Sequence, residues 1–259
     1  MKKIFYLAAL LLPLTLLSQV PARPFTINAK LDGFAEGTKV SLYQNGQQTE
    51  WLSTTIKQGK FSFKEKLAEP SLCFIVVDGV QKPIEVFTEP AVITIKGKKD
   101  AMDKVEITGS KSHKDFAEFV AAFLPKAQHL NALSNSLNQS PPGAERDAVM
   151  TTYTSVSQAM QQVIDNFIKS HPGSYVSAFI LSITYGFNED LAVLEARFAK
   201  LSESIRGSES GKELKEFKKK KKIGSVGSMA IDFTQEDTTG TPVSLSSFRG
   251  KYVLVDFWA

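Results

Sequence analysis

Between residues 25 and 108, apolar and polar residues alternate in short runs. A period of two residues is typical of β-strands that bury one face. The runs cover residues 25–31, 39–44, 49–56, 60–64, 71–77, 83–87, 91–96 and 104–108. Gly33, Gly46, Gly59 and Gly79 fall between runs and supply the positive φ that tight hairpin turns require. Short strands at this spacing predict an antiparallel β-sandwich or barrel over residues 24–109.

From residue 110 the period becomes helical. Ser112 and Asp115 form a capping-box-like helix start, and apolar residues follow at helical spacing as far as Leu137, with a kink expected at Pro125. A loop is predicted at residues 135–143. Further helices are expected at residues 149–167, 175–184, 189–201 and 208–220. Residues 110–221 are therefore predicted to form a helical region that packs through one face.

A second alternating stretch follows a joint rich in glycine and serine at residues 224–228. Met229, Ile231 and Phe233 alternate with polar residues, and a turn is expected where Asp237 precedes Gly240. A returning strand at residues 241–245 and an apolar strand at residues 252–258 complete the pattern. Residues 222–259 are thus predicted to begin a further domain, and the fold class of the chain is predicted to be α+β multidomain.

Composition narrows the possible classes of protein. The sequence is 42% hydrophobic and 22% charged, which suits globular domains with real cores and excludes a disordered or collagen-like chain. The formal net charge of +4 includes Lys2 and Lys3, which we expect to be removed. The sequence contains no nucleic-acid-binding motif. No nucleic-acid partner is therefore expected.

The first 22 residues have the three parts of a secretory signal peptide. Lys2 and Lys3 precede the apolar run 4–17, and Val20 and Ala22 supply the small residues that a signal peptidase reads. The run is shorter than the roughly 20 residues that span a bilayer, although an uncleaved anchor is the alternative. We expect cleavage after Ala22, export to the periplasm and no stable membrane span in the mature protein.

Cys73 is the single cysteine, so the chain forms no internal disulfide. Its apolar neighbours predict a buried, inert core thiol, and the alternative is a reactive thiol. His113, His129 and His171 are far apart, and no pair has the spacing of metal ligands, so no metal site is expected. No cofactor is expected either.

Five consecutive lysines, Lys218 to Lys222, end the last predicted helix. Cations at a helix C-terminus interact favourably with the helix dipole, and a solvated linker needs no partner. The alternative is an anionic surface that attracts the run, at about 1 kcal/mol for each lysine. The first interpretation is preferred.

Residues 223–259 resemble the entry to the thioredoxin-like domain of exported bacterial thiol-disulfide oxidoreductases of the TlpA/ResA type. Three sequence motifs and one turn carry the resemblance. The motifs are Ile-Asp-Phe-Thr at 231–234, Val-Ser-Leu-Ser-Ser-Phe-Arg-Gly-Lys at 243–251 and Val-Leu-Val-Asp-Phe-Trp-Ala at 253–259. The turn, between the first two motifs, has an acidic residue at Asp237 and a glycine at Gly240. The preceding sandwich and helices look like the accessory region of unknown function found ahead of this domain in a group of such proteins.

The resemblance implies a Cys-x-x-Cys pair directly after residue 259, at the start of a helix. In that chemistry the first cysteine attacks a disulfide as a thiolate and the second resolves the mixed disulfide. The chain carries neither cysteine, so we expect it to be an inactive N-terminal fragment of such an enzyme. The implied partners are thiols or disulfides of exported proteins.

Two positions match functional ones of this family. Asp256 stands where thioredoxins carry a buried acid that takes or returns the proton of the resolving thiol. Its alternative role is a strand-end carboxylate bonded to a neighbour. Trp258 stands where the family packs an aromatic ring against the active-site helix, and a plain core role is the alternative.

Two further hypotheses remain. The chain could be a non-catalytic module that binds an envelope component through its sandwich or helices. It could also belong to a peroxiredoxin, in which one peroxidatic cysteine follows a longer loop. The Trp258-Ala259 ending favours the oxidoreductase over the peroxiredoxin.

Overall fold

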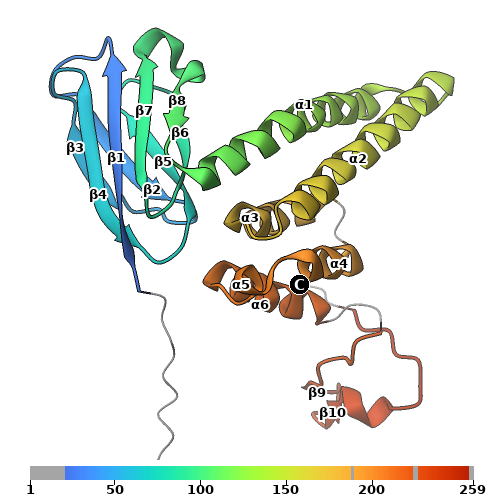
Figure 1. Ribbon diagram of the computed structural model, residues 1–259. Helices are drawn as coiled ribbons and strands as arrows, with labels where there is room; N and C mark the ends of the chain where they lie inside the picture. Colours follow the sequence, from blue (N-terminus) through green and yellow to red (C-terminus); the bar gives the residue numbers. More distant parts are fainter. Residues whose placement is uncertain (1–20, 188–189, 224–226, 257–259) are drawn as a thin grey trace, which may run out of the picture. The chain divides into compact units, whose positions relative to one another are not determined.

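The computed structural model describes residues 21–187, 190–223 and 227–256 (Figure 1). The chain has an α+β fold and divides into a first compact unit that ends at Ser110 and a second that begins at Lys111. The predicted signal peptide, apart from its last two residues, lies outside the described residues. No helix in the described part of the chain is both long and apolar enough to cross a membrane.

The first unit consists of two four-stranded sheets that form two layers in Figure 1. The first sheet has the order β4-β1-β7-β8 and the second the order β3-β2-β5-β6. The strands are β1 Arg23–Asp32, β2 Lys39–Gln44, β3 Leu52–Thr55, β4 Lys60–Leu67, β5 Ser71–Val77, β6 Ile84–Thr88, β7 Val92–Lys98 and β8 Glu106–Thr108, with a 3-10 helix η1 at Lys99–Lys104. The predicted sandwich is thus confirmed, and β2 and β5 have the predicted bounds.

One strand pair departs from the prediction of an antiparallel sheet. β1 and β7 run parallel, with Ile27 opposite Ile93 and Ala29 opposite Ile95, whereas the other pairs of the two sheets are antiparallel. Parallel neighbours need a long connection, and the chain between Asp32 and Val92 supplies it by building the whole second sheet and β4. The first sheet is therefore mixed.

Alternate residues of both sheets build one apolar core. Ile27, Leu42, Ile75, Ile93 and Ile95 are each 0% exposed. Each fully buried side chain of this size stabilises the fold by about 1.5–3 kcal/mol. The predicted turn glycines have positive φ, 88° at Gly33 and 80° at Gly46 among them. The sequence pattern and the observed core therefore agree.

The second unit begins with two long helices that lie side by side in Figure 1. The helices are α1 Lys111–Gln139, α2 Ala144–Ser170, α3 Tyr175–Thr184, α4 Leu191–Lys200, α5 Glu203–Arg206 and α6 Glu209–Lys222, with a 3-10 turn η2 at Tyr185–Phe187. α3 has the predicted bounds. Polar caps start the later helices, as where Ser208 accepts a hydrogen bond from the amide of Gly211.

Two details of the first helix correct the prediction. α1 begins at Lys111, so Ser112 lies inside its first turn and is buried rather than capping it. The helix also continues to Gln139, which shortens the predicted loop to residues 140–143. Pro125 lies inside this helix, and the kink expected there stays a prediction. The proline removes one backbone hydrogen bond of the helix. Burial of Phe119 before the proline and of Leu130 after it stabilises the helix on both sides.

The last described residues form a small hairpin. β9 Thr234–Glu236 pairs antiparallel with β10 Pro242–Ser244, and a 3-10 turn η3 follows at Leu245–Phe248. The apolar strand was predicted over residues 252–258. For residues 252–256 the prediction is wrong, because these residues do not form a strand. A strand needs a neighbour for its backbone hydrogen bonds, and no described strand pairs with these residues.

Candidate functional site

The C-terminal hairpin lies within residues 223–259, the segment with the family resemblance, and an aspartate organises its turn. Asp237 Oδ1 accepts hydrogen bonds from the amides of Thr239 at 2.8 Å and Thr241 at 3.0 Å. The Thr239 hydroxyl donates to the same oxygen at 2.6 Å. Gly240 completes the turn with a φ of 81°, as the sequence predicts. These donors, with the Thr239 side chain as the largest contribution, lower the pKa of Asp237.

A second aspartate ties η3 to the residues that precede β9. Asp232 Oδ1 accepts the amide hydrogen of Ser246 at 2.8 Å, and the amide of Leu245 donates to the carbonyl of Phe233 at 2.9 Å. Hydrogen bonds from Ser246 lower the pKa of Asp232. Both aspartates are therefore held as ionised acceptors, which suits a structural role better than proton transfer.

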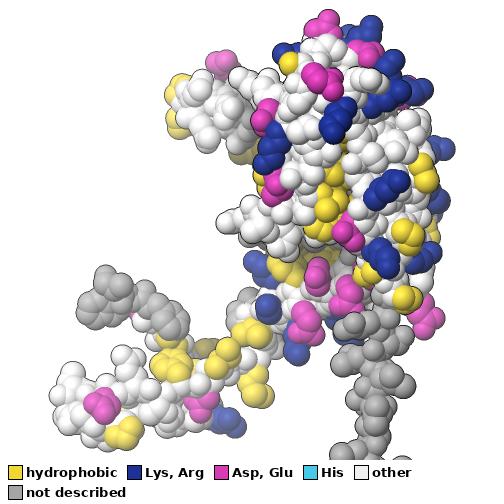
Figure 2. Space-filling model, turned by 90° about the vertical axis from the view of Figure 1, so that its left-hand side faces the viewer, with side chains coloured by type: hydrophobic (Ala, Val, Ile, Leu, Met, Phe, Trp, Pro, Cys, Tyr) yellow, Lys and Arg dark blue, Asp and Glu magenta, His cyan; other side chains and the backbone are white. Residues whose placement is uncertain are grey.

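The apolar side chains of this segment are exposed. Met229 is 87% exposed, Ile231 68%, Tyr252 108% and Leu254 95%. Yellow side chains are exposed in the lower part of Figure 2. Exposed apolar residues this closely grouped are typical of a surface that another element covers.

Of the two site residues predicted from the family resemblance, Asp256 lies within the described residues and Trp258 does not. Asp256 is exposed, so the structure provides no buried environment around it. Trp258 lies outside the described residues. The catalytic role of Asp256 and the supporting role of Trp258 stay predictions.

Cys73 lies in the core of the first unit. It is 0% exposed, the Ser71 hydroxyl lies 4.0 Å from its sulfur, and burial raises the pKa of its thiol. A thiol with a raised pKa and no exposure is a poor nucleophile and a poor redox group. The prediction of a buried core cysteine is confirmed, and its lack of reactivity stays a prediction.

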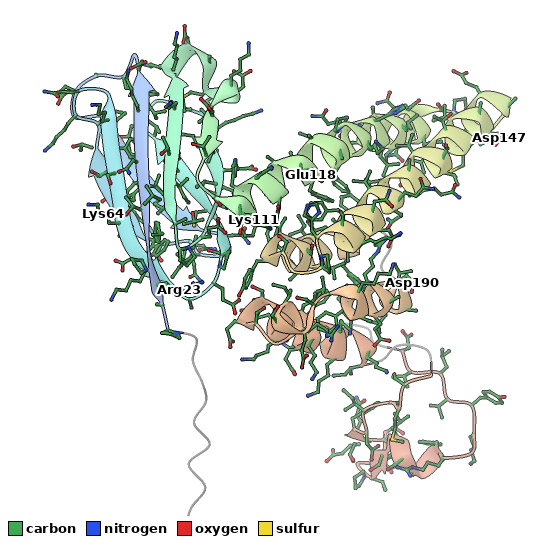
Figure 3. The ribbon with its side chains drawn as sticks, in the orientation of Figure 1. Arg23, Lys64, Lys111, Glu118, Asp147 and Asp190 are labelled. Atoms are coloured by element: carbon green, nitrogen blue, oxygen red, sulfur yellow. The ribbon has the colours of Figure 1, made fainter. Side chains whose placement is uncertain are left out.

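A buried polar cluster in the second unit was missed by the sequence analysis. Ser174 donates a hydrogen bond of 2.7 Å to Asp115 Oδ2, which also accepts from Lys111 Nζ at 3.1 Å. The His171 ring lies 3.9 Å from Asp115 and 3.7 Å from Glu118. Figure 3 labels Lys111 and Glu118 along α1. The cluster therefore joins the start of α1 to the residues between α2 and α3.

This cluster contains serine, histidine and aspartate but is not arranged as a catalytic triad. The Ser174 hydroxyl donates directly to the carboxylate and caps α3 by accepting from the amide of Val176. The histidine ring instead lies 2.9 Å from the Ser170 hydroxyl. Ser174 is 5% exposed and cannot present its hydroxyl to a substrate. Triads are defined by geometry, and this geometry is that of a structural link.

A buried arginine links α2 to α4 in the same unit. Arg197 is 5% exposed, and its guanidinium contacts Asp165 at 3.0 and 3.1 Å and the Gln161 side-chain oxygen at 2.9 Å. The hydrogen bond from Arg197 lowers the pKa of Asp165. A two-pronged contact of this kind fixes geometry, because both partners are planar.

The lysine run at the end of α6 packs on aromatic rings of its own unit. Lys218 Nζ lies 4.2 Å from the centre of the Phe198 ring, and Lys221 Nζ lies 5.5 Å from that of Tyr185. Cations over ring faces are attracted by the ring quadrupole. The run thus has intramolecular roles, and the helix it ends extends to Lys222.

A comparison with family models places one part of this chain. Residues 25–116 match the model described as a domain of unknown function, DUF4369. The match runs from Phe25 in β1 to Phe116 in α1, so it covers the whole core of the sandwich. No curated protein matches the chain. The sandwich is therefore similar to a domain to which the model assigns no activity.

Within the described residues, no three histidine, cysteine or carboxylate side chains gather in a way that would hold a metal ion. The histidines, Asp256 and Cys73 thus form no common site there. The segment that contains the C-terminal hairpin remains the candidate functional site because of its family resemblance. The structure shows an organised turn and exposed apolar side chains there.

Proposed function

We propose that this chain is part of an exported thiol-disulfide oxidoreductase, in which a thioredoxin-like domain begins near residue 223. In this proposal the sandwich and the helices are accessory units that present protein thiols or disulfides in the periplasm to the redox centre. Residues 1–259 contain no cysteine pair, so we expect them to be inactive by themselves.

The observation that carries the proposal is the exposed apolar surface of the C-terminal segment. Met229, Ile231 and Phe233 alternate before β9, and Tyr252 to Val255 follow η3 as four consecutive exposed apolar residues. A central strand of a parallel sheet is apolar on both faces, since helices cover both sides. The run from residue 252 has this composition and is suited to a strand of an α/β domain.

Asp256 and Trp258 take their roles only in such a completed domain. There Asp256 would lie beneath the cysteine pair and exchange a proton with the resolving thiol, and Trp258 would pack against the helix that carries the pair. The organised turn at Asp237 would then connect the first two strands of the domain.

The coding sequence that follows residue 259 tests this proposal directly. We expect a Trp-Cys-x-x-Cys sequence that begins within the first few residues after Ala259. The protein completed with those residues should reduce insulin in the presence of dithiothreitol, and replacing either cysteine by serine should abolish turnover. A continuation without the pair, or a completed protein without turnover, would refute the redox proposal.

The 259-residue chain is the matched negative control in that assay. Its single thiol, Cys73, is buried, so insulin reduction should stay at the rate of dithiothreitol alone. Measurable turnover by this chain would contradict the assignment of the redox centre to residues beyond Ala259.

A non-catalytic binding module is the second candidate. It is favoured by the many lysines on the outer face of the first sheet, which have no role in a redox mechanism.

A further inference from the structure

The outer face of the first sheet carries six lysines on three adjacent strands. Outward residues of β4, β1 and β7 include the set that we call the lysine face: Lys60, Lys64 and Lys66 on β4, Lys30 on β1, and Lys96 and Lys98 on β7. Figure 2 views the protein from the left-hand side of Figure 1, where β3 and β4 are drawn. Lysine and arginine side chains recur along the right-hand side of this view. Figure 3 labels Lys64.

The strand register brings three of these lysines into one row. Lys30 is the partner of Lys60 on β4 and of Lys96 on β7. Neighbouring strands lie about 4.8 Å apart, so the three Cα atoms fall within about 10 Å. Like charges directly opposite one another destabilise a sheet. The row therefore has a cost that the sandwich itself does not explain.

Protection of sheet edges accounts for only part of the lysine face. Lysines on an edge strand prevent unwanted pairing, and β4 is an edge strand of the first sheet. β1 and β7 are central strands, and their edges are already paired. Lys30, Lys96 and Lys98 thus need another explanation.

Carboxylates neutralise the face only in part. Asp32 and Glu106 are the acidic residues at outward positions of the paired strands, and Lys30 Nζ lies 3.6 Å from Asp32. Both side chains of that pair are more than half exposed, so solvent screens it. Among the described residues, no carboxylate pairs with Lys60, Lys64 or Lys96. Six lysines against two carboxylates leave the face strongly positive.

One end of the face is hollowed. An open hollow of about 370 Å³ is lined by the lysines Lys30, Lys96, Lys98 and Lys104 with Asp32 and Glu106. The four lysines outnumber the two carboxylates of this lining, so the hollow has a positive balance and offers the several donors that a phosphate-bearing group needs.

We propose that the lysine face docks on the surface of a bilayer that contains anionic phospholipids, with a headgroup phosphate in the hollow. The positive charges extend in two dimensions, along β4 and across to β7, which matches a planar array of phosphates. Val92, at an outward position at the other end of β7, is 62% exposed and adds an apolar contact. The outward positions of these strands carry no aromatic ring on which nucleic-acid bases would stack.

This proposal is independent of the redox proposal, since it concerns only the first unit. Each lysine near an anionic leaflet strengthens binding on the order of fivefold. Replacing Lys30, Lys60 and Lys96 by Gln should therefore weaken partition on the order of 100-fold. Binding should also weaken as salt concentration rises, because salt screens exposed charges.

The test is co-sedimentation of the full chain with vesicles of phosphatidylglycerol mixed with phosphatidylcholine, and with vesicles of phosphatidylcholine alone. The variant K30Q/K60Q/K96Q is compared with K169Q/K215Q/K220Q, which removes the same charge from exposed lysines of α2 and α6. Residues 4–17 are common to all variants, so any binding through them cancels. The variant K30R/K60R/K96R should retain binding.

The expected result is binding to the anionic vesicles that the first triple variant loses and the control keeps. Equal binding to vesicles of phosphatidylcholine alone, or equal loss in both triple variants, would overturn the proposal. So would binding to heparin without binding to vesicles, which would assign the face to a soluble polyanion. Thermal unfolding of each variant checks that the sandwich is intact.

Discussion

The first unit and the C-terminal segment carry the same alternating pattern but bury it differently. In β1 and β7 the inward residues Ile27, Ile93 and Ile95 are 0% exposed, whereas Ile231 in the segment is 68% exposed. The sandwich has a second sheet to cover its apolar face, and the described part of the segment has a two-stranded hairpin. An alternating pattern therefore places the apolar side chains on one face of a strand, and that face is buried only where a second layer of structure covers it.

The difference also sets how each region would respond to a partner. Covering a large apolar side chain gains about 1.5–3 kcal/mol, so the exposed residues of the segment favour association with further structure. The sandwich has already gained this energy internally. Its remaining surface, the lysine face, can attract a partner mainly through charge.

Thiol reactivity should separate the two regions by the largest factor. Cys73 is 0% exposed and should react with Ellman's reagent only when the sandwich unfolds, about a thousandfold or more slowly than a free thiol. A cysteine placed by V253C, where Val253 is 43% exposed, should react at once. The measurement is the time course of thiol release in wild type and variant. Rapid reaction of Cys73 in the wild type would show that the core is open.

Truncation of matched isoleucines should give the next largest difference. Ile95→Ala should lower the free energy of unfolding of the sandwich by about 2–5 kcal/mol, because it leaves a cavity in a fully buried site. Ile231→Ala should change stability by about 0.5 kcal/mol or less. Urea unfolding followed by Trp51 fluorescence in a Trp258→Phe background reports the first unit, since the Trp51 ring lies 5.4 Å from Phe25. Similar losses in both variants would contradict the comparison.

Side-chain period predicted most of the secondary structure, but it could not predict which elements become neighbours. β2, β5 and α3 have the predicted bounds because their turns and caps are local signals. The parallel pairing of β1 with β7 has no such signal, since a period of two defines a face and not a partner strand. The row of Lys30, Lys60 and Lys96 depends on that register and was missed for the same reason.

The candidate site was predicted from resemblance, and only its turn can be compared with the structure. Asp237 and Gly240 form the expected turn because both signals are local. Ser174 and Asp115 are 59 residues apart, so their hydrogen bond depended on the packing of α1 beside the junction of α2 and α3. Burial of Asp256 would equally depend on elements that the described residues do not include.

Removal of a buried hydroxyl should cost more than removal of an exposed one. Ser174→Ala should destabilise the second unit by about 1–3 kcal/mol, because it leaves Asp115 without its 2.7 Å donor and α3 without its cap. The matched change Ser247→Ala removes an exposed hydroxyl that donates to the carbonyl of Ser244 at 2.6 Å. It should change stability by less than about 0.5 kcal/mol. Circular dichroism at the helical wavelength during thermal unfolding measures both, and equal shifts would refute the structural role of the cluster.

Acid should produce the smallest difference between the regions. Hydrogen bonds from Ser41, Lys39 and Ser53 lower the pKa of Glu50 from 4.5 to about 2. Lys39 Nζ lies 2.9 Å from its carboxylate, whose side chain is 30% exposed. Because the folded pKa lies below the unfolded one, the stabilisation is complete above pH 4.5 and is lost as the pH falls towards 2.

The sandwich of wild type should therefore lose stability between pH 4.5 and 2 more steeply than that of Glu50→Gln. The pKa of Asp237 is also lowered, but its carboxylate holds only the C-terminal turn. Asp237→Asn should thus leave the pH dependence of the sandwich unchanged. Urea midpoints of the Trp51 signal across this pH range measure all three proteins. If Glu50→Gln kept the wild-type slope, or Asp237→Asn altered it, the acid response would not arise from the contact of Glu50 with the second sheet.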